Sequence, residues 1–195
     1  MGKTRLEAFS DGVLAIIITI MVLELKVPHG DNLVELQPLL PVFISYVLSF
    51  VNIGIYWNNH HHLMHAAHKI DGKVMWANMH LLFWLSLMPF ASGWMGENHF
   101  TTLPTALFGV ILLMAGVAYY ILSQCLIKFH GKDSTLAKAV GNDAKGIISM
   151  IVYAIGIVLS FFNAWISLAL YTSVAIMWLV PDKRIENKLV EEEGS

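Results

Sequence analysis

The first candidates for chemistry are carboxylates at both ends of an apolar stretch near the N-terminus. Asp11 precedes this stretch, which runs from Gly12 to Leu23, and Glu24 follows it. As a helix it would be about 18 Å long, well short of the roughly 30 Å hydrocarbon core of a bilayer. A carboxylate facing lipid costs about 2.5 kcal/mol or more, so Asp11 is expected to face protein or water. The sequence therefore predicts a helix in the middle of an assembly, beside an aqueous path.

The same stretch has a helical pattern of branched apolar side chains. At 100° per residue, Ile16, Ile20, Leu23 and Val27 fall on one narrow stripe, with Thr19 on its flank. Periodicity alone is compatible with ordinary helix packing or with a line of side chains facing a pore. The neighbouring Ser10 and Asp11 need a polar environment that ordinary packing does not supply, which favours the pore.

A second candidate is the histidine-rich segment 59–68. His61, His65 and His68 are spaced i, i+4, i+7, so two of them could bind Zn²⁺ or Ni²⁺ from one helical face. Asp71 is the nearest carboxylate, which leaves the ligand set incomplete. The segment is therefore interpreted first as an interfacial loop and helix end, with a pH-sensitive contact or a metal site as the alternatives.

Composition places these residues in a membrane protein. The chain has 195 residues, of which 56% are hydrophobic and 13% charged, about half the charged fraction of an ordinary soluble domain. No basic cluster suggests a nucleic-acid partner. Phosphate-binding glycine loops, G-x-S-x-G elbows and Thr-Val-Gly-Tyr-Gly filters are absent from the sequence, so neither an enzyme nor a cofactor is expected. The lone Cys125 is interpreted as a small apolar residue.

Hydropathy predicts a single all-α domain, residues 1–195, with six transmembrane helices. Pro89 is expected to kink the third helix. The last apolar run is too long for one crossing, so it is interpreted as a hairpin broken near Asn163. The predicted spans are 9–27, 39–57, 74–95, 103–127, 146–162 and 164–180, followed by a charged tail, 181–195.

Basic residues predict the orientation. In a six-span chain, eleven of the twelve Lys and Arg residues fall on one side of the membrane, and only Lys26 lies opposite. Basic residues favour the cytoplasmic side, so both termini are expected to be cytoplasmic. Five spans would move the C-terminal basic residues outside.

Several of these motifs resemble the transmembrane protein 175 family, the endolysosomal potassium channels and their bacterial relatives. The first helix carries the most specific part, and the remaining pieces spread the similarity over the whole chain as one six-span unit, as in bacterial members. The matching residues are Arg5, Phe9-Ser10-Asp11-Gly12, Ala15-Ile16, Thr19, Trp57, His60-His61, Asn78, Pro89-Phe90 and Gly96-Glu97. The additional histidines after His61 depart from the family's pattern.

The resemblance implies a homotetrameric, potassium-preferring cation channel in the bacterial inner membrane, with K⁺ as the permeating ion. Four first helices would line a central pore without a carbonyl filter. Ile16 would form the narrowest hydrophobic ring, Ile20 and Leu23 further rings, and Thr19 would contribute to potassium preference. A polar network would tie the first helix to its neighbours through Arg5, Phe9, Ser10, Asp11, Trp57, His60, His61 and Asn78.

Two other functions are considered. The first is a proton- or divalent-metal-coupled transporter that uses the His60–His68 cluster, although the chain lacks the midplane charges and broken repeats typical of such carriers. The second is a membrane scaffold without transport, which would leave Asp11 and the stripe beside Thr19 without a role.

Overall fold

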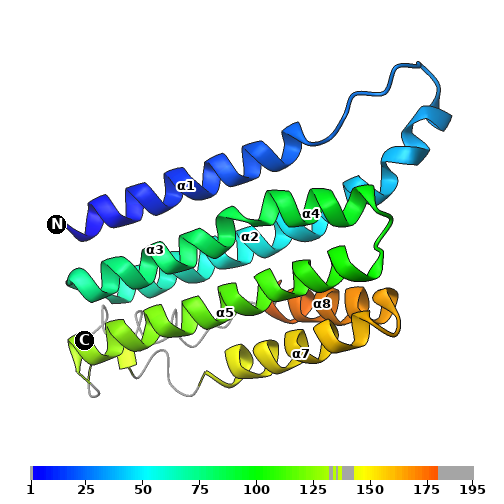
Figure 1. Ribbon diagram of the computed structural model, residues 1–195. Helices are drawn as coiled ribbons and strands as arrows, with labels where there is room; N and C mark the ends of the chain where they lie inside the picture. Colours follow the sequence, from blue (N-terminus) through cyan, green and yellow to red (C-terminus); the bar gives the residue numbers. More distant parts are fainter. Residues whose placement is uncertain (1, 132–133, 135, 138–142, 180–195) are drawn as a thin grey trace.

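The computed structural model describes residues 2–131, 134, 136–137 and 143–179, and every regular element in these ranges is helical (Figure 1). The predicted all-α fold is therefore confirmed. The elements are α1 (Lys3–Leu23), the 3₁₀ turn η1 (Leu33–Leu39), α2 (Leu40–Ala66), α3 (Gly72–Ser86), α4 (Met88–Glu97), α5 (Thr102–His130), α7 (Ala144–Ser160) and α8 (Ala164–Leu179).

The described chain makes six helical passes, because α3 and α4 continue one another across Leu87. Four passes are long and apolar enough to cross a membrane: α1, η1 with α2, α3 with α4, and α5. Helices α7 and α8 have 17 and 16 residues, which at 1.5 Å per residue is about 25 Å, slightly less than the hydrocarbon core.

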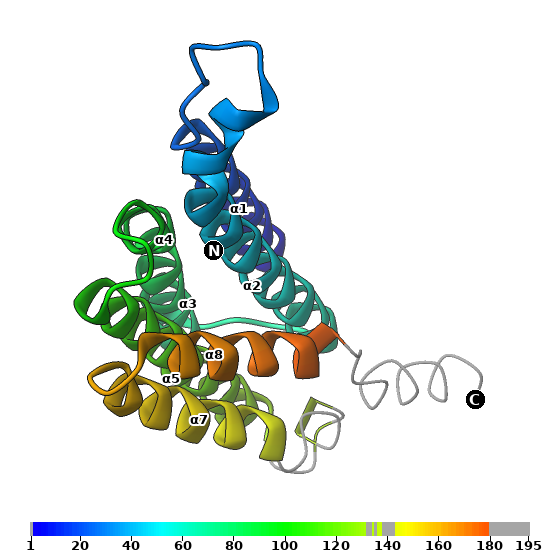
Figure 2. The same cartoon turned by 90° about the vertical axis from the view of Figure 1, so that its right-hand side faces the viewer.

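The helices run side by side, with α1 along one edge of the subunit and the α7–α8 hairpin along the opposite edge (Figure 1). Helix α1 packs against α2, α3 and α4, whereas α5 packs against α3, α4, α7 and α8. The view turned by 90° shows α1 next to α2 and apart from α7 and α8 (Figure 2). One side of α1 is therefore covered by its own subunit, and the other side is left open.

Local sequence explains where several helices begin and break. Pro41 lies in the first turn of α2 and Pro89 in the first turn of α4, where a missing backbone N–H costs nothing. The predicted kink at Pro89 is thus present as a break at Leu87. The hairpin break is also where it was expected, since α7 ends at Ser160 and the Asn163 side chain accepts a hydrogen bond from the Trp165 N–H (2.9 Å).

Several helix limits differ from the predicted spans, because hydropathy reports membrane depth and not where a helix ends in water. Helix α1 starts six residues earlier than the predicted 9–27 and ends at Leu23, so Val27 is not part of its stripe. Helix α2 continues nine residues beyond the predicted 39–57 and carries most of the histidine-rich segment. The predicted tail, 181–195, and the last residue of span 164–180 lie outside the described residues.

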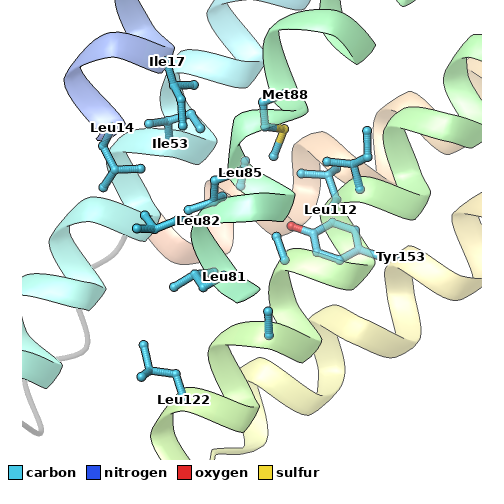
Figure 3. Packing of buried hydrophobic residues seen from close by; sticks show 14 of the residues in the cluster. Leu14, Ile17, Ile53, Leu81, Leu82, Leu85, Met88, Leu112, Leu122 and Tyr153 are labelled. Atoms are coloured by element: carbon cyan, nitrogen blue, oxygen red, sulfur yellow. The ribbon is translucent and has the colours of Figure 1, made fainter. Parts of the chain in front are cut away.

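The core is built from apolar side chains that several helices contribute. Leucine and isoleucine side chains of α1, α2, α3 and α5 meet with Tyr153 of α7 in one continuous cluster (Figure 3). Helix α3 occupies the middle, with Leu81, Leu82 and Leu85 all buried. This core holds α2 and α3 in fixed positions under α1.

Candidate functional site

Helix α1 presents two different faces. The inner face, formed by Leu6, Ser10, Leu14, Ile17 and Met21, is buried against the subunit. The predicted stripe lies on the outer face: Ile16 is 60% exposed, Ile20 43% and Leu23 75%, whereas Ile17 is only 3% exposed. The apolar side chains of the predicted stripe are thus left largely uncovered by the described part of their own chain.

Thr19 lies on the same outer face. Its hydroxyl donates a hydrogen bond to the Ala15 carbonyl, four residues earlier (2.9 Å). Because the hydroxyl hydrogen is engaged in the helix, the lone pairs of Oγ1 point outward. An oxygen in this state can coordinate a cation.

A buried hydrogen-bonded chain joins three helices on the inner side of α1. Ser10 Oγ of α1 donates to the Leu6 carbonyl (2.8 Å) and accepts from Asn78 Nδ2 of α3 (2.9 Å). Asn78 Oδ1 is paired with His60 Nε2 of α2 (2.8 Å), and all three residues are buried. Since the Ser10 hydrogen is already used, Asn78 must present its amino group to Ser10 and its carbonyl oxygen to His60. The His60 proton is therefore on Nε2.

Asp11 bonds to α2 through an aromatic side chain. The indole Nε1–H of Trp57 donates to Asp11 Oδ1 (3.0 Å), in an exposed part of the subunit. Arg5 is exposed, and the described residues provide no ion-pair partner for it. Phe9 is half exposed beside them. The structure therefore connects Asp11 with Trp57 and leaves Arg5 outside this contact.

The histidines after Trp57 form an exposed ladder on α2. The ring of His61 stacks on Trp57 and on His65, with centroid distances of 6.1 and 6.3 Å. His68 does not share their helical face, because α2 ends at Ala66 and the chain turns to extended geometry at Ala67. Among the described residues, no three His, Cys, Asp or Glu side chains are arranged to bind a metal ion.

His130, at the end of α5, has a structural role that its sequence position did not reveal. Its Nε2 accepts from the backbone N–H groups of His68 (3.0 Å) and Lys69 (3.3 Å), and its Nδ1 faces the Leu126 carbonyl at 2.9 Å. This arrangement fixes the proton on Nδ1 and ties the linker between α2 and α3 to α5. About sixty residues separate the partners, so no local pattern could have indicated the contact.

At the opposite end of the bundle, Lys26, in the segment that follows α1, pairs with Glu97 at the end of α4. The Lys26 ammonium lies 2.9 Å from Glu97 Oε1. The hydrogen bond and charge of Glu97 raise the pKa of Lys26 above its usual value. Both groups are exposed, so the pair contributes little to stability, but it links the chain after α1 to the end of α4.

Comparison with known proteins gives the family. The family model described as "Endosomal/lysosomal potassium channel TMEM175" matches residues 5–89. A Chryseobacterium protein named "Potassium channel HX13_20290" is 54% identical over 191 residues, which is 98% of this chain and 100% of the relative. The chicken (Gallus gallus) "Endosomal/lysosomal proton channel TMEM175" is 34% identical over 103 residues, or 47% of this chain and 21% of the chicken protein.

A solved structure has the same architecture over almost the whole chain. The crystal structure of a lysosomal potassium-selective channel TMEM175 homolog from Chamaesiphon minutus superimposes with a TM-score of 0.75 and 26% identity. The match covers 91% of this chain and 96% of the other. Together with the full-length bacterial relative, this shows that the chain belongs to the TMEM175 family.

Proposed function

We propose that this chain forms a homotetrameric cation channel that prefers potassium, with four copies of α1 around a central pore. The observation that carries the proposal is the outer face of α1, where Ile16, Ile20 and Leu23 are 60%, 43% and 75% exposed in their own subunit. The relatives are named as potassium channels in bacteria and as proton channels in animals, which supports ion conduction as the activity. Conduction, and not catalysis, is the proposed activity.

The polar groups of α1 favour a pore over lipid as the neighbour of this face. Asp11 is exposed and is bonded by one oxygen only, to Trp57. A carboxylate in this position needs water or another protein chain, since lipid cannot solvate it. One subunit has a single helix of this kind and cannot enclose a path, so closed rotational symmetry would complete it.

The proposed constriction is hydrophobic. Four Ile16 side chains meeting on an axis offer water no hydrogen-bonding partner, so the ring would dewet and gate the pore. Ile20 and Leu23 would form further rings, and Thr19 Oγ1 would offer an oxygen to K⁺ between them. The sequence has no Thr-Val-Gly-Tyr-Gly motif for a carbonyl filter, so K⁺ preference would be modest.

Membrane placement is part of the proposal. The basic residues favour a cell-membrane protein with both termini in the cytoplasm. Transport through the His60–His68 cluster is not favoured by the geometry, because His61 stacks between Trp57 and His65 while His68 lies beyond the end of the helix.

The test replaces two neighbouring isoleucines, which lie on opposite faces of α1, by asparagine one at a time. Ile16→Asn should wet the ring, raise K⁺ current in reconstituted bilayers and admit Na⁺ more readily. Ile17→Asn is the matched control: its side chain is buried in the subunit, so it should lower thermal stability without raising current. If Ile16→Asn assembles normally and leaves current and the K⁺/Na⁺ ratio unchanged, Ile16 does not line the constriction.

A further inference from the structure

A second polar site lies inside the subunit, away from α1. It is a cavity of about 50 Å³ between α2, α5, α7 and α8. Its polar and aromatic lining includes Asn52, Tyr56, Asn59, Tyr119, Tyr153 and Trp178. No residue of α1 lines the cavity, so it is separate from the proposed pore.

Several side-chain oxygens in this cavity lack hydrogen-bond partners among the described residues. Asn52 donates through Nδ2 to the Leu48 carbonyl (2.9 Å), which leaves its Oδ1 unpaired. The hydroxyls of Tyr56 and Tyr153 are also without a described partner. Asn52 is only 2% exposed and Tyr153 4%. These oxygens are not among the fully shielded unpaired side-chain atoms of the described residues, which are Ser49 Oγ and the Tyr171 hydroxyl, so water in the cavity can reach them and satisfy them.

Two other polar groups in the lining are already satisfied. The Tyr119 hydroxyl donates to the Asn59 carbonyl (3.1 Å), and Ser149 Oγ accepts from Trp178 Nε1 (2.8 Å). The lining extends from Asn52 to Asn59 on α2, about 10 Å along the helix, and it also includes Asp143 at the start of α7.

The size of the cavity decides what can occupy it. One water needs about 10–15 Å³ of such space, so about three to five fit. An apolar cavity that binds benzene measures about 150 Å³, three times as much, which excludes an aromatic ligand. A desolvated cation would need compensating charge. Among the described lining residues the one carboxylate is Asp143, which already caps α7 by accepting from the Gly146 N–H (3.0 Å).

We propose that each subunit binds a small cluster of ordered water molecules in this cavity, held by Asn52 Oδ1 and the hydroxyls of Tyr56 and Tyr153. Water there bridges Asn52 on α2 to Tyr153 on α7. The proposal does not depend on the channel function, because the site is defined by unpaired oxygens and volume. Its test uses no flux measurement, so failure of either proposal leaves the other standing.

Hydroxyl-radical footprinting of the intact protein, with radicals generated from water by brief X-ray exposure, tests the assignment. Met150 and Tyr153 line the cavity and should be oxidised several-fold faster than two buried controls that do not line it. The controls are Met88 and Tyr171, which are both 0% exposed. Equal rates at the cavity residues and the controls would overturn the proposal.

Two further arms identify the occupant. Asn52→Leu removes an acceptor at nearly unchanged side-chain volume, so Met150 oxidation should fall. Tyr153→Phe, which removes one hydroxyl, should also lower it. Unchanged oxidation in both folded variants would mean that bulk solvent reaches Met150 and would overturn the bound cluster. Protection of Met150 when K⁺ replaces N-methylglucamine would identify a cation as the occupant, which also overturns it.

Discussion

Asn78 is the residue on which the attachment of α1 depends most. Its amide connects Ser10 on α1 with His60 on α2, and no other described hydrogen bond joins these three helices in one chain. The amide can do this because it offers a donor and an acceptor in opposite directions. A carboxylate of the same reach could accept from His60 but would have no hydrogen to donate to Ser10.

Asn78→Leu should therefore destabilise the subunit. Leucine has nearly the same shape, but it leaves the buried His60 N–H without an acceptor, at a cost of about 1–3 kcal/mol. Ser10 Oγ also loses the hydrogen bond from Asn78 and keeps only its bond to the Leu6 carbonyl. The expected result is a lower thermal unfolding temperature in detergent. Asn58→Leu is the control, because Asn58 is exposed and makes no described side-chain hydrogen bond; a similar loss in both variants would argue against the network.

At the level of elements, α5, α7 and α8 are held at close distance by glycines around one tyrosine. Tyr171 of α8 is fully buried and lies against Gly109 of α5 and Gly156 of α7. A Cβ atom at either glycine would overlap the tyrosine ring or its hydroxyl. Small residues let helices approach closely in membranes, where van der Waals packing replaces the hydrophobic driving force.

Gly109→Ala should consequently force α5 and α8 apart and destabilise the fold by about 1–3 kcal/mol through overpacking. Gly93→Ala on α4 is the matched control, since no atom lies within 4 Å of the added Cβ. Thermal unfolding in detergent distinguishes the two variants. Equal stability of Gly109→Ala and the unmodified protein would show that the helices can move to accommodate the added methyl group, and would contradict the prediction.

For the whole molecule, the distribution of charge makes the sharpest prediction. With both termini inside, residues 31 and 98 should be outside and residue 134 inside. In a Cys125→Ala background, a membrane-impermeant maleimide should label Asp31→Cys and Asn98→Cys in intact cells, and Ser134→Cys only after permeabilisation. Labelling of Ser134→Cys in intact cells would contradict the predicted orientation in the membrane.

The number of helical passes in the described chain, and the breaks between helices, could be predicted from the sequence because they depend on local physics. Proline removes a backbone donor wherever it stands, so Pro89 indicated the break between α3 and α4. An uncharged run too long for one crossing indicated the α7–α8 hairpin. That Ile16, Ile20 and Leu23 share one face of α1 follows from the helical period, whereas the exposure of that face is decided by packing.

Contacts between distant residues were decided only by the tertiary structure. The sequence indicated that Asp11 needs a polar partner, but the packing of α1 on α2 made that partner Trp57 and not Arg5. The bonds from His130 to the linker after α2, and the unpaired oxygens around the internal cavity, likewise depend on how helices are rotated against one another. Hydropathy records how deep a residue lies in the membrane, whereas a hydrogen-bond partner is determined by helix rotation, on which the apolar pattern of a single helix has no bearing.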